Sequence, residues 1–129
     1  MNRSNLVAKF IAPIAATLFA SAAFAHPSLV SSSPADKSQV AAPATIELKF
    51  SETLVPQFSA ANLIMMTGMP GMPNHGAMKV SASVSGASDG KTMVITPAQT
   101  LQPGAYRVDW RAVSSDTHPI NGNVTFQVK

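Results

Sequence analysis

The imidazole and thioether groups are the side chains of this sequence with the most distinctive chemistry. The 129 residues include three histidines and seven methionines but no cysteine. The lack of cysteine excludes disulfides, thiolate metal sites and cysteine nucleophiles. A metal site in this chain must therefore use imidazole, carboxylate, amine or thioether ligands.

Methionines are concentrated in residues 65–78, which hold five of the seven together with one histidine. Pro70 and Pro73 predict a surface loop there. Exposed thioethers without a core to fill suit a soft ion, because neutral sulfur prefers Cu(I) to Cu(II), Zn(II) or Ca(II). The alternatives are a hydrophobic docking surface and a loop that folds back on the domain. We expect Met65 and Met93 to belong to the core instead.

The motif Asp116-Thr117-His118 places a carboxylate and an imidazole two residues apart. In an extended segment this spacing directs both side chains to the same side, so the pair could offer one oxygen and one nitrogen ligand. The alternative is an aspartate that accepts hydrogen bonds within a turn, beside an exposed histidine. A further nitrogen donor nearby would favour the metal site.

Residues 1–25 have the layout of a secretory signal peptide. Arg3 and Lys9 precede an apolar run at residues 10–19, and the segment ends in an A-x-A cleavage motif at residues 23–25. A membrane anchor is disfavoured because Pro13 interrupts a run that is shorter than a bilayer span. We therefore expect cleavage after Ala25 and a mature extracytoplasmic domain of residues 26–129.

Cleavage would make His26 the first residue of the mature chain. A free N-terminal histidine can chelate one ion through its amine and Nδ1, and Cu(II) prefers such nitrogen ligands. Pro27 has no N–H, so the next backbone amide cannot bind the metal. Together with Asp116 and His118, the His26 amine and ring would give three nitrogens and one oxygen for Cu(II). The alternative is that histidine follows the cleavage site by chance.

The positive charge of the full chain belongs mostly to the signal peptide. The formal net charge is +3, with nine basic and six acidic residues. Arg3 and Lys9 lie in the leader, so residues 26–129 keep seven basic against six acidic side chains, a net charge of +1. Because no basic cluster remains, nucleic acid is not expected as a partner.

Alternating apolar and polar residues predict an all-β domain without a sustained helical period. Turn-forming residues separate the runs, including Asp89-Gly90, Pro103-Gly104 and Asn121-Gly122. We expect the last of these to form the tight final connection. An antiparallel sandwich or Greek-key barrel accommodates this pattern in one domain. Seven strands are predicted, at residues 29–32, 45–50, 62–67, 79–85, 92–96, 106–112 and 124–128.

Several of these segments resemble the periplasmic copper-resistance proteins of the CopC/PcoC type. The similar motifs are His26-Pro27 followed by Leu-Val-Ser-Ser, the strand ELKFSE at residues 47–52, the Met-Pro-Gly-Met loop and DWRAVSSDTHP at residues 109–119. The resemblance covers essentially all of residues 26–129. It implies a seven-stranded, cupredoxin-like Greek-key β-barrel that binds copper and has no catalytic activity.

The resemblance also implies two copper sites and a partner. The Cu(II) site would use the amine and ring of His26 with Asp116 and His118, and Glu52 would lie just outside the ligands. An inner-membrane copper importer, CopD, would be the partner. Relative to close relatives, Pro73-Asn74 adds one residue between Met72 and His75, a departure that bears on whether His75 is a ligand. The Cu(I) site would draw on Met66, Met69, Met72, His75 and Met78.

We therefore expect a periplasmic protein that buffers or carries copper for resistance and homeostasis. One alternative is a copper monooxygenase-like enzyme, which would use the same N-terminal histidine clamp to activate oxygen. The small size of this chain and its few aromatic residues disfavour that activity. A carboxylate ligand from Asp116 also disfavours it, because it would fill the coordination position that O2 needs. The other alternative is a metal-free β-sandwich interaction module that docks partners through the methionine loop.

Overall fold

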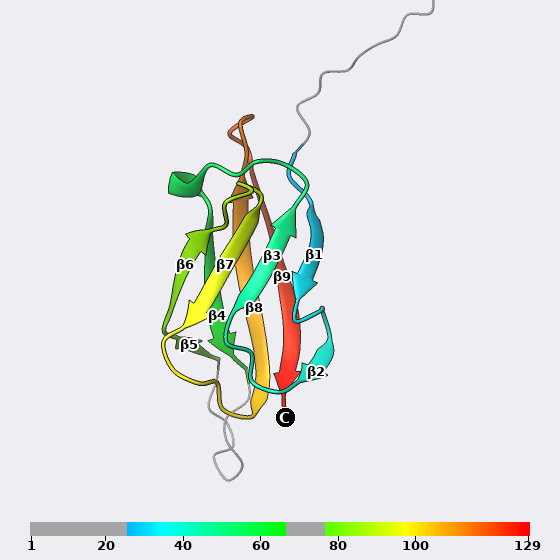
Figure 1. Ribbon diagram of the computed structural model, residues 1–129, viewed down its shortest axis with the longest axis vertical. Helices are drawn as coiled ribbons and strands as arrows, with labels where there is room; N and C mark the ends of the chain where they lie inside the picture. Colours follow the sequence, from blue (N-terminus) through cyan, green and yellow to red (C-terminus); the bar gives the residue numbers. More distant parts are fainter. Residues whose placement is uncertain (1–25, 67–76) are drawn as a thin grey trace, which may run out of the picture.

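The computed structural model describes residues 26–66 and 77–129, and these form nine strands and one short 3-10 helix (Figure 1). Within these residues no helix has the length and apolar character needed to cross a bilayer. The elements are β1 (Leu29–Ser33), β2 (Ser38–Val40), β3 (Ile46–Phe50), η1 (Pro56–Phe58), β4 (Ala60–Met65), β5 (Met78–Val80), β6 (Ala82–Gly86), β7 (Thr92–Pro97), β8 (Gly104–Val113) and β9 (Pro119–Val128).

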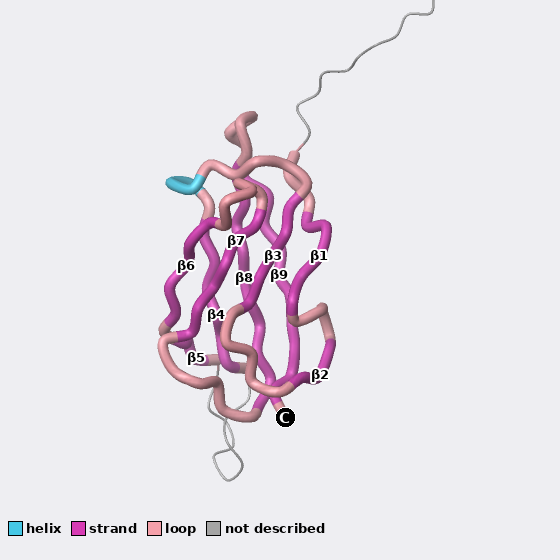
Figure 2. The backbone as a smooth tube through the Cα atoms, viewed as in Figure 1, coloured by secondary structure: helices cyan, strands magenta, loops and turns pink. Residues whose placement is uncertain are grey.

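The strands form two sheets that pack face to face as a sandwich (Figure 2). One sheet has the order β1-β3-β7-β6, and the other has the order β2-β9-β8-β4-β5. Neighbouring strands are antiparallel except for β2 and β9, which are parallel. The predicted all-β sandwich is therefore confirmed, and the long β8–β9 hairpin forms the centre of the larger sheet.

The core lies between the sheets and follows the predicted alternation of apolar residues. In β3 the apolar residues Ile46, Leu48 and Phe50 are buried while Glu47 and Lys49 are exposed. The same pattern buries alternate residues of β8 and β9. Phe50 of β3 and Trp110 of β8 join the two sheets, with ring centroids 5.0 Å apart, and Tyr106 stacks on Phe126 of the neighbouring strand with ring centroids 5.6 Å apart. Met93 is buried and Met65 packs against the same core, as predicted.

The predicted strand at residues 79–85 is wrong as a single element. The chain leaves the larger sheet after β5 and joins the edge of the smaller sheet as β6, with Ser81 between them. The alternation of apolar and polar residues continues when the chain passes from one sheet to the other, so the sequence pattern does not indicate this break. β2 is also additional to the seven predicted strands.

The predicted turn at Asn121-Gly122 is wrong as well, because both residues lie inside β9. Gly122 is paired with Trp110 of β8. A Cβ atom at this position would lie 2.4 Å from a carbon of the indole ring. Glycine is therefore needed for the close approach of the tryptophan ring to the β9 backbone. The β8–β9 connection lies instead at residues 114–118.

We expect Gly122→Ala to destabilise the fold by about 1–3 kcal/mol, because the added methyl group overlaps the Trp110 ring. Gly86→Ala is the matched control, since a Cβ there meets nothing within 4 Å. Urea denaturation followed by the fluorescence of Trp110, the one tryptophan of the chain, measures both variants. Equal stability of the two variants would contradict this account of the β8–β9 packing.

Candidate metal centre

Three predicted ligands meet at one end of the sandwich, where β1 begins and β8 connects to β9 (Figure 1). One ligand atom from each of His26, Asp116 and His118 lies within 4.8 Å of the other two. Nδ1 of His26 is 2.8 Å from Oδ2 of Asp116, and Nδ1 of His118 is 3.9 Å from the same oxygen. The structure thus brings the residue before β1 and two residues of the β8–β9 connection, which are far apart in the sequence, into one cluster.

His26 is held in place by the two residues that follow it. The side chain of Pro27 is fully buried. The Ser28 N–H donates to Oγ of Ser51 at 3.0 Å, and the Ser51 N–H donates to the Ser28 carbonyl at 2.9 Å. These contacts fix the start of β1 against the end of β3, while the His26 side chain stays 56% exposed. The imidazole therefore projects from an anchored backbone.

Asp116 and His118 lie in a tight turn, so the predicted extended segment is wrong at this point. The Thr117 N–H donates to the Ser114 carbonyl at 2.9 Å, and Thr117 has a φ of 63°. This left-handed conformation is unfavourable for a β-branched residue. The β8–β9 pairing between Val113 and Pro119 closes the turn on both sides. The two ligands thus approach each other through turn geometry and not through strand alternation.

The Asp116 carboxylate has one oxygen in hydrogen bonds and one facing the imidazoles. Oδ1 accepts from the His118 N–H at 3.1 Å and from the Ser114 hydroxyl at 3.2 Å. Oδ2 is buried and lies 2.8 Å from His26 Nδ1, and it accepts no hydrogen bond from any other described residue. A buried carboxylate oxygen without a hydrogen bond is costly unless a cation compensates it. This oxygen therefore suits a metal ligand.

The electrostatics of the cluster keep the carboxylate ionised. The His118 N–H lowers the pKa of Asp116 most, and the Ser114 hydroxyl and His26 lower it further against an opposing effect of burial. At neutral pH the group is an anionic oxygen ligand beside two imidazoles, whose ring centroids are 5.9 Å apart. Nitrogen and anionic oxygen donors of this kind suit Cu(II).

The other predicted site residues lie outside this cluster. Glu52 is half-buried in the segment after β3, and its predicted place beside the ligands stays a prediction. Met78 is 58% exposed and pairs with Met65 where β4 meets β5, and Met66, which follows Met65, is 39% exposed. The remaining predicted Cu(I) ligands, Met69, Met72 and His75, lie outside the described residues.

Met66 and Met78 lie near the end of β8 that is opposite to the cluster of His26, Asp116 and His118. Met65 is paired with Tyr106 near the start of this strand, whereas the turn with Asp116 follows Val113 at its end. Seven residues of strand separate these positions, which corresponds to about 23 Å. Met66 and Met78 are therefore too far from His26 and His118 to bind the same ion.

Sequence reasoning missed the hydroxyl groups that hold the ligands. Ser114 precedes Asp116 by two residues, and Ser51 follows the last residue of β3. A serine two residues before an aspartate is a weak local signal of a side-chain hydrogen bond in a turn. The contact between Ser28 and Ser51 has no comparable signal, because it joins residues that are 23 positions apart.

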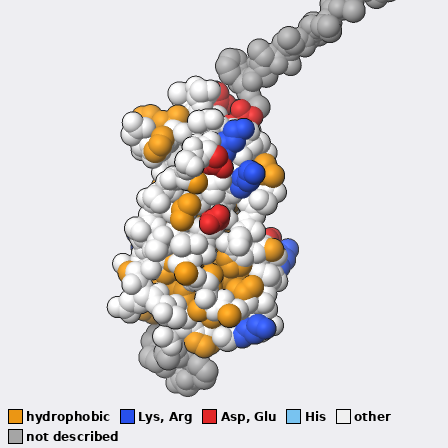
Figure 3. Space-filling model, viewed as in Figure 1, with side chains coloured by type: hydrophobic (Ala, Val, Ile, Leu, Met, Phe, Trp, Pro, Cys, Tyr) orange, Lys and Arg blue, Asp and Glu red, His pale blue; other side chains and the backbone are white. Residues whose placement is uncertain are grey.

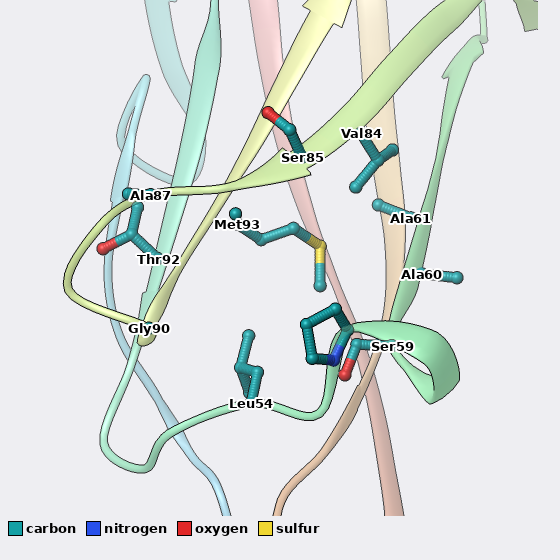
Figure 4. Close-up of a pocket in the computed structure, with 12 residues that line it drawn as sticks. Leu54, Ser59, Ala60, Ala61, Val84, Ser85, Ala87, Gly90, Thr92 and Met93 are labelled. Carbon is teal, nitrogen blue, oxygen red and sulfur yellow. The ribbon is translucent and has the colours of Figure 1, made fainter.

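An apolar cavity of about 430 Å³ opens between β4 and the β6–β7 hairpin (Figure 4). The side chains of Leu54 and Met93 face into it. Its lining contains no charged residue and no member of the metal cluster. Hydrophobic side chains also gather on the surface around η1 (Figure 3, viewed as in Figure 1), where Phe58 is 58% exposed.

Comparison with known proteins identifies the family. A family model described as the CopC domain matches residues 29–129. Copper resistance protein C of Pseudomonas syringae pv. tomato is 60% identical over 129 residues, which cover 100% of this chain and 98% of that protein. Copper resistance protein C of Escherichia coli is 59% identical over 107 residues, covering 83% and 84% of the two chains.

A solved structure agrees with this match. The crystal structure of PcoC, a methionine-rich copper-resistance protein from Escherichia coli, has a TM-score of 0.74 and 57% sequence identity. It covers 81% of this chain and 100% of its own. The chain therefore belongs to the CopC family of copper-resistance proteins, which bind copper and are not enzymes.

Proposed function

We propose that this protein is a periplasmic copper carrier or buffer with a Cu(II) site at His26, Asp116 and His118 and a Cu(I) site in the methionine segment. The observation that carries the proposal is the cluster around the buried Oδ2 of Asp116, which lies 2.8 Å from His26 Nδ1 and 3.9 Å from His118 Nδ1 and accepts no hydrogen bond from any other described residue. Membership of a copper-resistance family supports copper as the cargo.

Removal of residues 1–25 would complete the Cu(II) ligand set. Cleavage after Ala25 frees the amine of His26, which can then close a chelate ring with Nδ1 of its own side chain. His118 supplies a third nitrogen and Asp116 an anionic oxygen, a set that suits the tetragonal geometry of Cu(II). Pro27 and Ser28 hold this new N-terminus in place, because the proline is buried and the serine is bonded to Ser51.

The Cu(I) site would lie at the opposite end of the sandwich. Met66 and Met78 are exposed there on either side of the segment that contains Met69, Met72 and His75. Thioether sulfur binds Cu(I) well and Cu(II) poorly, so each end of the domain would hold one oxidation state. We further propose a CopD-like inner-membrane importer as the partner that receives the copper.

A copper-dependent monooxygenase is the weaker alternative. It would share the N-terminal histidine clamp, but it needs an open coordination position for oxygen. Oδ2 of Asp116 lies 2.8 Å from His26 Nδ1 and would fill such a position. A carrier needs only that copper binds and leaves, and a closed set of four ligands serves that purpose.

The first test concerns the free amine. A mature protein with one glycine added before His26 should bind Cu(II) at least about tenfold more weakly, which corresponds to ~1.4 kcal/mol. Its Cu(I) affinity and its denaturation curve should stay those of the mature protein. Competition titrations with chelators of each ion measure both affinities. Unchanged Cu(II) affinity and an unchanged paramagnetic resonance spectrum would show that the amine is not a ligand.

The second test concerns the thioethers. Substituting Met69 and Met72 by leucine removes sulfur and keeps size, so we expect weaker Cu(I) binding and a stability change of less than about 1.5 kcal/mol. Peroxide should have the same effect, because the sulfoxide is a poor soft ligand. Met93→Leu is the control, since this methionine is buried in the core. If Cu(I) affinity is the same in all forms, the loop is a docking surface instead.

The third test separates the two sites by pH. The imidazoles and the amine must lose protons before they bind Cu(II), whereas thioether sulfur carries none. Cu(II) affinity should therefore fall steeply as the pH decreases through about 6.5, the usual range of imidazole, while Cu(I) affinity changes little. The lowered pKa of Asp116 keeps its carboxylate ionised across this range. Equal pH slopes for the two ions would argue against two chemically different sites.

A further inference from the structure

Ser114 is a buried polar residue at the point where β8 enters the metal-binding turn. It is 3% exposed, and its carbonyl accepts the Thr117 N–H that closes the turn. Its hydroxyl is directed at Asp116, with Oγ 3.2 Å from Oδ1. The same residue thus stabilises the turn through its backbone and contacts the carboxylate through its side chain.

The contact determines which oxygen of Asp116 faces the imidazoles. Oδ1 accepts two hydrogen bonds, one from the Ser114 hydroxyl and one from the His118 N–H. The side-chain torsion that turns a carboxylate is otherwise broad, so a single hydrogen bond holds its plane loosely. With both bonds present, Oδ2 stays directed toward His26 Nδ1 and His118 Nδ1.

We propose that Ser114 is a positioning residue for the copper site, whose hydroxyl orients the Asp116 carboxylate so that Oδ2 binds Cu(II). This inference rests on the proposed Cu(II) site and adds a residue that does not itself touch the ion. Hydrogen bonds from outside the ligand set commonly orient ligating carboxylates, and their loss lowers metal affinity by about 10- to 100-fold.

The test compares Ser114→Ala with a matched variant elsewhere in the fold. The Thr92 hydroxyl is also buried and donates to a carboxylate, Oδ2 of Asp89, at 2.8 Å in the β6–β7 turn. Thr92→Val removes the hydroxyl that contacts Asp89, just as Ser114→Ala removes the hydroxyl that contacts Asp116. Both variants are prepared in the mature form, and Cu(II) affinity, the paramagnetic resonance spectrum of bound Cu(II) and thermal stability are measured.

We expect Ser114→Ala to bind Cu(II) about 10- to 100-fold more weakly and to show altered copper hyperfine splitting at saturation. Thr92→Val should lose stability but keep the affinity and the spectrum of the wild type. Ser114→Thr, which retains a hydroxyl, should recover most of the affinity. A merely structural role would lower the melting temperature of both hydroxyl-deletion variants and leave their copper spectra unchanged.

Asp116→Ala distinguishes failure of this inference from failure of the proposed site. If Asp116→Ala loses Cu(II) affinity while Ser114→Ala keeps the wild-type affinity and spectrum, the positioning role of Ser114 is overturned and the site remains. If Asp116→Ala binds Cu(II) as the wild type does, the carboxylate is not a ligand and both proposals fail.

Discussion

The antiparallel pairing of β8 with β9 is the interaction on which the rest of this structure depends. Ten residue pairs join the strands without a break, from Gly104 and Val128 at one end to Val113 and Pro119 at the other. The hairpin supplies both rings of the Tyr106–Phe126 stack and the Trp110 ring that contacts Phe50 of β3, and it pairs with β4 on one side and β2 on the other. Gly122 allows the Trp110 ring to lie against this ladder. The hairpin is therefore a rigid frame between the two ends of the sandwich.

In the proposed function, this frame would hold two kinds of copper site apart in a small domain. Its closed end carries Asp116 and His118, and β1 begins beside it, so His26 completes a cluster of nitrogen and oxygen ligands. Its open end lies beside the end of β4, where Met66 follows the strand and Met78 begins β5. Hard and soft ligands are thus separated by the length of a strand. If the proposed sites hold, each oxidation state of copper would be bound without competition from the ligands of the other.

The sequence predicted those features that depend on residue type and short-range alternation. Burial of every second residue in β3, β8 and β9 followed from the pattern, because one face of each strand contacts the core. The turn at Asn121-Gly122 was predicted wrongly. Gly122 is needed because the Trp110 ring of the neighbouring strand lies against it, and a contact between strands cannot be seen in a local sequence pattern. The meeting of His26 with Asp116 could be inferred from ligand chemistry, but the left-handed Thr117 and the Ser114 hydroxyl could not, because they depend on the fold around the turn.

The central claim is that one Cu(II) ion joins the N-terminus to the β8–β9 turn. The most direct measurement is pulsed electron paramagnetic resonance of the mature protein with one equivalent of Cu(II), in natural form and with 15N-labelled histidine. The account predicts a single copper species coupled to two imidazole rings and one amine nitrogen, all of which belong to His26 and His118. Coupling to one imidazole only, or two copper species with different nitrogen ligands, would contradict it.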